Sequence, residues 1–190
     1  VISEDVCPAN LHPYATSHRA GEDVVRAENE GGGIEGIVIR LSNAFGPPAH
    51  PGTNCWALLV NDLCRQAVTE HRMVLHSSGM QRRDFVTLHD VVTASRHLLE
   101  TEGVEGVYNL GGSWAPSVFE MALLIQERCE PLLGYEPEII RPLPASDETS
   151  PQFEYCIDRL AETGFRLGGR PELEIDGVLR LCRDYHAGTL

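Results

Sequence analysis

The sequence predicts an α/β protein with a largely parallel sheet. Short apolar, β-branched runs such as residues 34–42 (IEGIVIRLS) alternate with longer segments whose apolar residues recur at helical spacing. Alternation of this kind is typical of βαβ units, in which each helix covers buried strands. With 190 residues, 42% of them hydrophobic, the chain is large enough to bury a core.

Apolar periodicity and the residues that interrupt it give the order of the elements. The first helix should end at three consecutive glycines, residues 31–33, and Ser117 and Glu120 stand at capping-box spacing before the fourth. We expect helices over 14–30, 55–68, 91–99, 118–129 and 173–186, and strands over 34–42, 73–78, 82–90, 106–112 and 138–143. We expect loops or linkers over 1–12, 43–54 and 144–151.

The charges of the chain exclude several functions. All 15 basic residues are arginines, against 28 acidic ones, so the net charge is −13. Without lysine the chain cannot supply a Schiff-base nitrogen or a Walker-type lysine. The acidic balance argues against nucleic acid and anionic membranes as partners. An anionic ligand must therefore be held by a few local arginines, histidines or backbone amides.

Other composition features indicate a reduced cytoplasmic protein without a metal. No apolar run reaches the roughly 18 residues that a membrane span needs, and the first ten residues do not resemble a signal peptide. The six cysteines form no CxxC pair, which favours free thiols. The eight histidines form no HExxH or similar ligand spacing, so we expect no metal site.

One formal GxGxxG match occurs, at Gly31, Gly33 and Gly36. It follows a predicted helix and precedes a predicted strand, which is the reverse of the order that places a phosphate at a helix N-terminus. We interpret it as a loop that ends a helix.

Four motifs occur in a recognisable order: PYATSH at 13–18, IRLSNAFGPP at 39–48, GMQRRDFVTLHDVV at 79–92 and YNLGG at 108–112. Together they resemble the extended short-chain dehydrogenase/reductases, in the branch of NAD-dependent nucleotide-sugar epimerases and dehydratases. The pattern of that family is YxxxK, RxxNxxGP, GxxxRDFVxVxD and YNxGG. DRLAETGF at 158–165 is similar to the last helix and turn of the family, so the resemblance covers nearly the whole chain.

The resemblance implies the C-terminal part of a Rossmann-like parallel sheet with an interleaved small α/β substrate-binding region. Residues 1–46 and 80–114 would belong to the Rossmann-like domain, and residues 47–79 and 115–190 to the substrate-binding region. The glycine-rich cofactor motif, the acidic residue that binds the ribose and the catalytic Ser/Thr are then expected upstream of residue 1. The chain would be a C-terminal fragment or half of a split protein.

The resemblance implies that Tyr14 is the general base, which takes a proton from a sugar hydroxyl while hydride passes to NAD. The family lowers the pKa of this tyrosine with a lysine four residues on, and here that position is His18. Residues i and i+4 share a helix face. A histidine has a reference pKa near 6.5 and is mostly neutral at pH 7. In its protonated form it would support Tyr14 electrostatically, and in its neutral form it would bind a ribose hydroxyl. The alternative is that catalysis is degraded or lost.

Further site residues follow from the same resemblance. Tyr14, His18 and the backbone of Leu41 and Ser42 are expected to lie at the cofactor, NAD or NADP, which is bound mainly by residues upstream. Asn43 and Arg83 are expected to hold the nucleotide diphosphate, with Arg141 as a second phosphate contact. A guanidinium offers a planar fork that fits two phosphate oxygens.

Two other charged residues lie in or beside the same motifs. Arg40, at the end of the first strand, is equally consistent with a structural ion pair and with a ligand contact. Asp90 matches an acidic family position and is expected to be structural, capping the helix that follows it.

The predicted function is that of an NAD-dependent nucleotide-sugar epimerase or dehydratase for polysaccharide or lipopolysaccharide synthesis, with a homodimer in the full-length protein. The isolated chain is expected to be inactive. The alternative is a non-catalytic nucleotide-sugar-binding or assembly module that has lost its cofactor-binding half.

Overall fold

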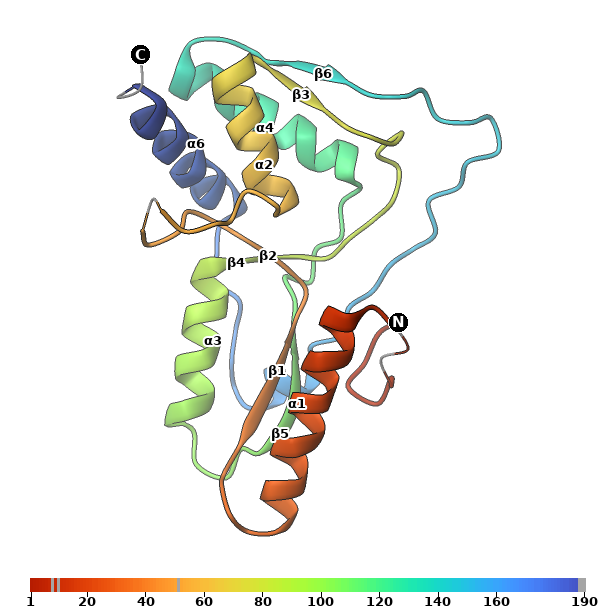
Figure 1. Ribbon diagram of the computed structural model, residues 1–190, viewed down its shortest axis with the longest axis vertical. Helices are drawn as coiled ribbons and strands as arrows, with labels where there is room; N and C mark the ends of the chain where they lie inside the picture. The colour runs from red at the N-terminus through yellow and green to blue at the C-terminus, as the bar shows by residue number, and fades with distance from the viewer. Residues whose placement is uncertain (8, 10, 51, 188–190) are drawn as a thin grey trace.

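A computed structural model describes residues 1–7, 9, 11–50 and 52–187 of the chain. The helices are α1 (Pro13–Glu30), α2 (Leu59–Glu70), α3 (Leu88–Glu100), α4 (Val118–Leu133), α5 (Asp158–Glu162) and α6 (Pro171–Ala187). The strands are β1 (Ile37–Leu41), β2 (Asn43–Phe45), β3 (Arg72–Val74), β4 (Phe85–Thr87), β5 (Gly106–Leu110) and β6 (Glu138–Ile140). Helices α2, α4 and α6 gather at one end of the molecule and α1, α3 and α5 at the other (Figure 1).

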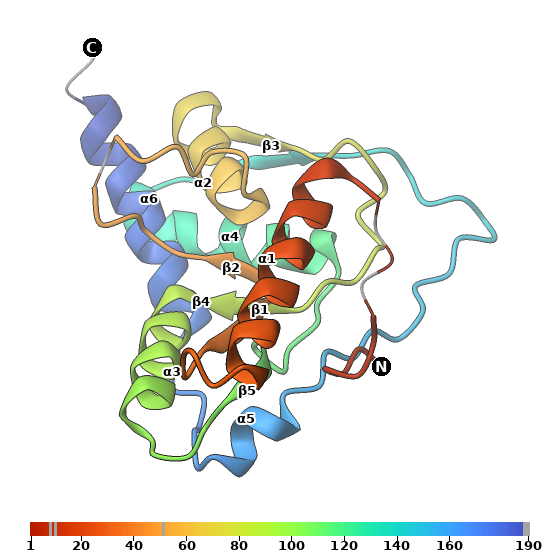
Figure 2. The same cartoon turned by 60° about the horizontal axis from the view of Figure 1, so that its bottom comes forward.

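The named strands form three parallel pairs, β1 with β5, β2 with β4, and β3 with β6. This confirms the predicted α/β class with parallel strands. Only Ser42 separates β1 from β2, so one run of chain leaves the partner β5 and joins the partner β4 (Figure 2). The backbone N–H of Ser42 still donates to Leu110 O at 3.0 Å, and that of Asn43 already donates to Asp84 O at 3.2 Å.

The apolar side chains form two cores, one at each end of the molecule. The larger core lies among α2, α4 and α6 and includes Leu63, Met121 and Leu179. The smaller core lies between β5, α3 and α5 and includes Leu98 and Leu160. Within the described residues, no helix combines the length and the apolar character that crossing a bilayer requires.

Three cysteines are completely buried in the larger core: Cys64, Cys129 and Cys182. Burial raises the pKa of the Cys129 and Cys182 thiols to about 12 and raises that of Cys64 well above its ordinary value. These three side chains therefore behave as small hydrophobic groups rather than as nucleophiles.

Local signals placed several boundaries correctly. Helix α1 ends at Gly31, as the glycine run predicts. The capping box of α4 is present, because Ser117 Oγ accepts from the backbone N–H of Glu120 at 3.1 Å and Glu120 Oε2 accepts from that of Ser117 at 2.6 Å. The hydrogen bond from the Ser117 amide is the main cause of the lowered pKa of Glu120.

Other boundaries were wrong. The predicted loop over 43–54, of which Pro51 lies outside the described residues, contains strand β2. The predicted strand over 82–90 is ordered as a strand only at 85–87, since Thr87 caps α3 and the helix begins one residue later. The helix predicted from residue 55 begins at Leu59.

Asp90 is not the cap of the helix that follows it, which corrects the expectation. It lies in the first turn of α3, where its backbone N–H donates to the cap residue Thr87 at 3.0 Å. Its buried carboxylate accepts from Thr87 Oγ1 at 2.7 Å and from the amides of Gly168 and Gly169 at 2.8 and 2.9 Å. Asp90 thus attaches the loop before α6 to α3.

The backbone of β4 passes so close to Gly112, just after β5, that no side chain fits there. A Cβ atom there would lie 1.9 Å from Phe85 O, whereas a Cβ on Gly21, in α1, would have no neighbour within 4 Å. We expect Gly112→Ala to lower the free energy of unfolding by about 2 kcal/mol or more, because backbone must move. Gly21→Ala should cause no loss, since alanine favours a helix. Urea unfolding followed by circular dichroism measures both, and equal stabilities would contradict the close approach.

Candidate functional site

Two of the predicted binding residues lie together where β1 passes into β2. The side-chain amide of Asn43 donates to Asp84 O at 2.8 Å. Arg83 precedes Asp84 and is exposed, and its backbone N–H donates to Pro116 O at 3.2 Å. Its guanidinium forms no hydrogen bond or ion pair with any residue in the described part of the chain. The structure therefore brings Asn43 and Arg83 together and leaves the charge of Arg83 available to a ligand.

The backbone beside Arg83 is fixed by the buried Asp84 carboxylate. Asp84 is 1% exposed, and its two oxygens accept from the amides of Gly112, at 2.8 Å, and Trp114, at 3.3 Å. A carboxylate that is buried needs such donors. Asp84 therefore holds the loop after β5 against the segment that carries Arg83.

Arg141 lies at the other end of that segment. Its guanidinium donates to Ser78 O, and Cζ lies 3.5 Å from the centroid of the Phe119 ring in the first turn of α4. The amide of Phe119 donates to Gly79 O at 2.9 Å. Arg83 and Arg141 are thus placed at opposite ends of residues 78–83, which run along the N-terminus of α4.

The predicted catalytic pair is at the N-terminal end of α1. The rings of Tyr14 and His18 are in contact, with centroids 4.4 Å apart and planes tilted by 54°. His12 caps the helix, its side chain accepting from the backbone N–H of Tyr14 at 3.3 Å, and Pro13 occupies the first turn. Tyr14 is 69% exposed, so little protein surface surrounds the hydroxyl.

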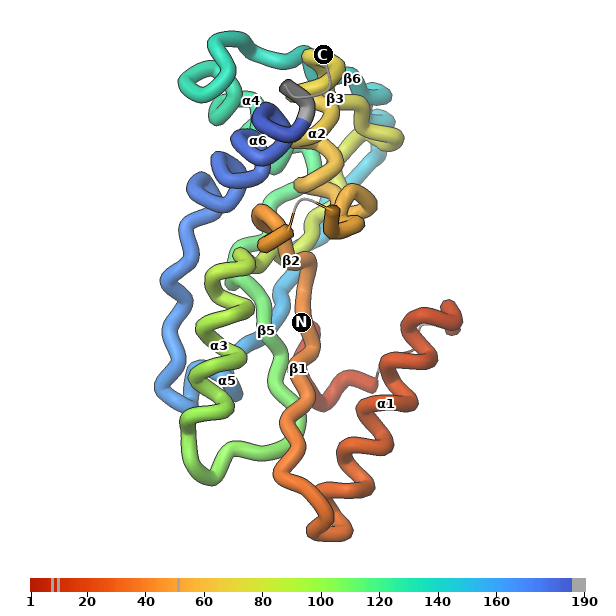
Figure 3. The backbone as a smooth tube through the Cα atoms, turned by 60° about the vertical axis from the view of Figure 1, so that its left-hand side comes forward, coloured from red at the N-terminus to blue at the C-terminus, as the bar shows by residue number. Residues whose placement is uncertain are grey.

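The predicted catalytic pair and Asn43 both lie toward the carboxyl end of β1, but no hydrogen bond or ion pair joins them in the described part of the chain. Helix α1 runs antiparallel to β1, so its N-terminus is near the carboxyl end of that strand (Figure 1). Figure 3 shows α1 diverging from the strands toward its N-terminal end. Among the described residues, no hydrogen bond or ion pair joins Tyr14 or His18 to Asn43, Arg83 or Arg141.

Arg40 forms a structural ion pair, which settles the two alternatives for this residue. Its Nε and Nη2 donate to the two carboxylate oxygens of Glu22 at 2.9 and 2.5 Å. Its Nη1 donates to Glu4 O at 2.9 Å and to Val6 O at 3.3 Å. The hydrogen bonds to Glu22 are the largest cause of the raised pKa of Arg40. The guanidinium is therefore occupied by the protein itself.

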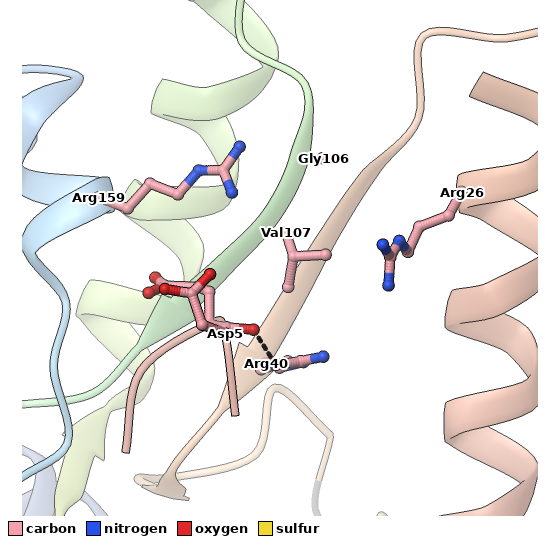
Figure 4. A pocket seen from close by; sticks show the side chains of 7 residues that line it. Asp5, Arg26, Arg40, Gly106, Val107 and Arg159 are labelled. Atoms are coloured by element: carbon pink, nitrogen blue, oxygen red, sulfur yellow. Dashed lines mark hydrogen bonds between the residues drawn. The ribbon is translucent and has the colours of Figure 1, made fainter. Parts of the chain in front are cut away.

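A hollow of about 420 Å³ lies elsewhere, beneath α1 and beside β1 and the start of β5 (Figure 4). Arg26 and Arg159 reach toward it from opposite sides. It is lined by Glu4, Asp5, Arg26, Arg40, Gly106, Val107 and Arg159. Its lining runs from Gly106 and Val107 at the start of β5 to Arg40 near the end of β1, and includes neither Asn43 nor Arg83. In the described residues, no group of three or more His, Cys, Asp or Glu side chains could hold a metal ion.

The residues at the carboxyl end of β1 fit a cofactor group. Ser42 Oγ is buried and has no hydrogen-bond partner among the described residues, and buried hydroxyls usually have one. Leu41 beside it is 47% exposed. The glycine run at 31–36 connects α1 to β1 and does not lead into a helix, so it offers no pyrophosphate cradle.

Sequence reasoning missed two residues that hold α1. Glu22 binds Arg40, and the side chain of Asn29 both donates to Gly36 O and accepts from its N–H, each at 2.7 Å. The position of Glu22, one helical turn after His18, was the available signal for the first.

Comparison with known proteins identifies relatives for most of the chain. The family model described as "NAD dependent epimerase/dehydratase family" matches residues 2–111, more than half of the chain. A protein of Methanocaldococcus jannaschii, whose name proposes a UDP-glucose 4-epimerase, is 27% identical over 173 residues, covering 90% of this chain and 52% of its own. The dTDP-D-glucose 4,6-dehydratase of Mus musculus is 29% identical over 150 residues, 78% of this chain and 37% of its own. The chain spans about half the length, or less, of these curated relatives.

Solved structures share the fold. RMD from Pseudomonas aeruginosa, complexed with NADPH, superimposes with a TM-score of 0.79 at 20% identity, covering 97% of this chain and 60% of its own. TunA, an NAD-dependent NDP-hexosamine 5,6-dehydratase of tunicamycin biosynthesis, superimposes with a TM-score of 0.71 at 25% identity. The match covers 98% of this chain and 57% of the TunA chain. The described strands and helices are thus part of a Rossmann-type fold.

Tyr155 contacts the end of β1 through its hydroxyl. Its hydroxyl donates to Arg40 O at 2.9 Å and lies 3.2 Å from Asn109 Oδ1. Burial raises the pKa of Tyr155 to about 12.

This pKa predicts a loss of stability at high pH. A tyrosine in the unfolded chain ionises near pH 10, so between about pH 10 and 12 the unfolded state loses its proton first and is favoured. The free energy of unfolding should therefore be constant below pH 10 with respect to this group and fall above it. Tyr155→Phe should show a shallower fall, and Tyr14→Phe, which leaves Tyr155 in place, should keep the steep one. Urea unfolding at a series of pH values checks this, and parallel curves for all three proteins would contradict it.

Proposed function

This chain belongs to the NAD dependent epimerase/dehydratase family, and from that premise we propose that it carries the catalytic helix and the substrate-binding part of an NAD-dependent nucleotide-sugar epimerase or dehydratase. The observation that carries the proposal is that Arg83, whose guanidinium has no partner among the described residues, directly precedes Asp84, the residue that Asn43 contacts just beyond the carboxyl end of β1. Ligands of open α/β sheets bind at this end of the strands.

Arg83, Asn43 and Arg141 would hold the nucleotide diphosphate. In a chain with a net charge of −13, a diphosphate requires a local positive site. Arg83 supplies a planar fork for two phosphate oxygens, and Arg141, which rests on Phe119, supplies a second cation at the other end of residues 78–83. The names of the relatives suggest UDP- or dTDP-hexoses as substrates.

The chemistry would take place between Tyr14 and the cofactor. NAD, or NADP, accepts a hydride from a sugar carbon when bound. Tyr14 would take the hydroxyl proton, and His18, whose ring lies against it, would stabilise the phenolate when protonated. The backbone of Leu41 and Ser42 would lie at the nicotinamide, where the partnerless Ser42 Oγ is a candidate contact.

We further propose the division of the chain into two regions. Residues 1–46 and 80–114 would form the remaining part of the Rossmann-like domain, and residues 47–79 and 115–190 the substrate-binding region. Leu160 and Phe165, which pack in the smaller core with β5, would be the part of the second region that returns to the first. The active protein would be a cytoplasmic homodimer with a further cofactor-binding part, and the 190 residues alone would not turn over substrate.

The alternative is a non-catalytic nucleotide-sugar-binding or assembly module. The exposure of Tyr14 and the histidine in place of the lysine of the family favour it. Both functions require Arg83, and only the enzyme requires Tyr14.

We expect the 190-residue chain to bind UDP weakly through Arg83. Replacing Arg83 by alanine removes charge-assisted hydrogen bonds and should weaken binding about 10-fold. Arg96→Ala, which removes another exposed arginine, on α3 and paired with Glu100, is the control and should leave binding unchanged. Isothermal titration calorimetry or ligand-observed NMR measures the affinities, and equal weakening by both variants would exclude a diphosphate site at Arg83.

We expect the same chain to bind NAD weakly or not at all, because the glycine-rich cradle is not among its residues. Micromolar NAD affinity by isothermal titration calorimetry would refute the assignment of the main cofactor site to residues outside this chain.

In a catalytically active form that contains these residues, the pH dependence of the rate should depend on residue 18. Histidine ordinarily loses its proton near pH 6.5 and lysine near 10.4. His18→Lys should keep the rate at higher pH, because a lysine keeps its positive charge there and a histidine ordinarily does not. Superimposable pH–rate profiles for the two proteins would show that residue 18 does not assist Tyr14.

A further inference from the structure

We propose that the Glu22–Arg40 ion pair is the positioning device that sets where Tyr14 and His18 stand relative to the binding residues on β1 and β2. The proposal rests on the proposed function, because it assigns Glu22 and Arg40 a role in catalysis through Tyr14. Neither residue would touch substrate or cofactor.

The ion pair joins three segments at one guanidinium. Through two hydrogen bonds Arg40 binds both oxygens of Glu22 on α1, and through Nη1 it binds the carbonyls of Glu4 and Val6 in the N-terminal segment. The side chains of Arg40 and Glu22 are only 18% and 10% exposed, although the helix around them is largely exposed. A two-point contact between a guanidinium and a carboxylate fixes direction as well as distance.

Helix α1 depends on such a polar contact, because little of its surface is buried against the rest of the protein. None of its residues, all of which the structure describes, is buried. The hollow beneath α1, which Arg26 and Arg40 line, separates part of the helix from the strands (Figure 4). Most helices in proteins are stabilised by packing of an apolar face, and here polar contacts take over much of that role.

A second attachment, between Asn29 and Gly36, lies near the C-terminal end of α1. Together with the Glu22–Arg40 ion pair it determines the orientation of the helix. Asn29 exchanges two hydrogen bonds of 2.7 Å with Gly36, and a Cβ on Gly36 would lie 2.7 Å from Val25 Cγ1, so α1 touches the chain closely there. One attachment leaves a helix free to pivot. Two attachments, at Asn29 and Glu22, define its axis.

The active end of α1 lies beyond both attachments. At a rise of 1.5 Å per residue, Tyr14 is about 12 Å from Glu22 and about 22 Å from Asn29 along the helix axis. A pivot of roughly 10° about Asn29 would therefore move Tyr14 by about 4 Å. Misplacement of about 1 Å can already cost roughly 100-fold in rate, so an ion pair that prevents this pivot controls catalysis from a distance.

The first test uses the 190-residue chain and does not depend on activity. Glu22→Gln keeps the shape of the side chain and removes its charge. We expect amide hydrogen exchange in residues 14–22 to become at least about 10-fold faster, because the end of the helix loses its attachment, while α3 keeps its exchange rates. Glu22→Asp should lie between the two proteins. Glu100→Gln, which breaks an exposed ion pair with Arg96, is the control and should leave α1 unchanged. Unchanged exchange in residues 14–22 of Glu22→Gln would overturn the proposal.

The second test separates positioning from a general structural role. In a catalytically active form that contains these residues, Glu22→Gln should lower kcat by about 10-fold or more with KM for the nucleotide sugar nearly unchanged, since Asn43 and Arg83 are untouched. Glu22→Asp should recover part of the rate. A raised KM at constant kcat would overturn the positioning role. Full activity of Tyr14→Phe would instead contradict the proposed function, and the exchange experiment would still decide whether Glu22 attaches the helix.

Discussion

The buried carboxylate of Asp84 is the constraint on which the arrangement of this molecule depends. Its oxygens hold the amides of Gly112 and Trp114, and its carbonyl accepts from both the backbone and the side chain of Asn43. One residue thus joins the end of β5, the start of β2 and the start of β4. The two cores lie at opposite ends of the molecule, and the candidate binding residues Asn43 and Arg83 lie at this junction.

The candidate site combines residues on paired strands with residues on a helix that is held mainly by polar contacts. Asn43 and Arg83 belong to backbone that is fixed by strand pairing and by the buried Asp84. Tyr14 and His18 belong to a helix that buries none of its residues and is attached by polar groups. The distance between Tyr14 and the candidate binding residues Asn43 and Arg83 is therefore set by hydrogen bonds, whose geometry single substitutions can alter. Preorganisation of a catalytic group depends on such supporting residues as much as on the group itself.

The sequence was sufficient for features that depend on neighbours along the chain. The capping box of α4 and the glycine stop of α1 were placed correctly, because each is a contact within a few residues. The partners of Arg40 and Asp90 were not predictable in this way, since Glu22 is 18 positions away and Gly168 is 78. Strand β2 was missed for the same reason: three residues in a Pro- and Gly-rich stretch become a strand only because β4 lies beside them. The candidate binding residues came from motif order. That Asn43 contacts Asp84 and Arg141 contacts Ser78, at the two ends of the segment that carries Arg83, came from the fold.

The burial of three thiols in the larger core allows the opening of that core to be followed by thiol modification. Cys64, Cys129 and Cys182 all lie among α2, α4 and α6, and the smaller core, as far as the chain is described, contains no cysteine. Cys7, by contrast, is exposed in the N-terminal segment. A thiol-modifying reagent would thus meet Cys7 in the folded molecule, whereas it would reach Cys64, Cys129 and Cys182 only after the larger core opens. The rate at which Cys64, Cys129 and Cys182 are modified would therefore report the opening of the larger core.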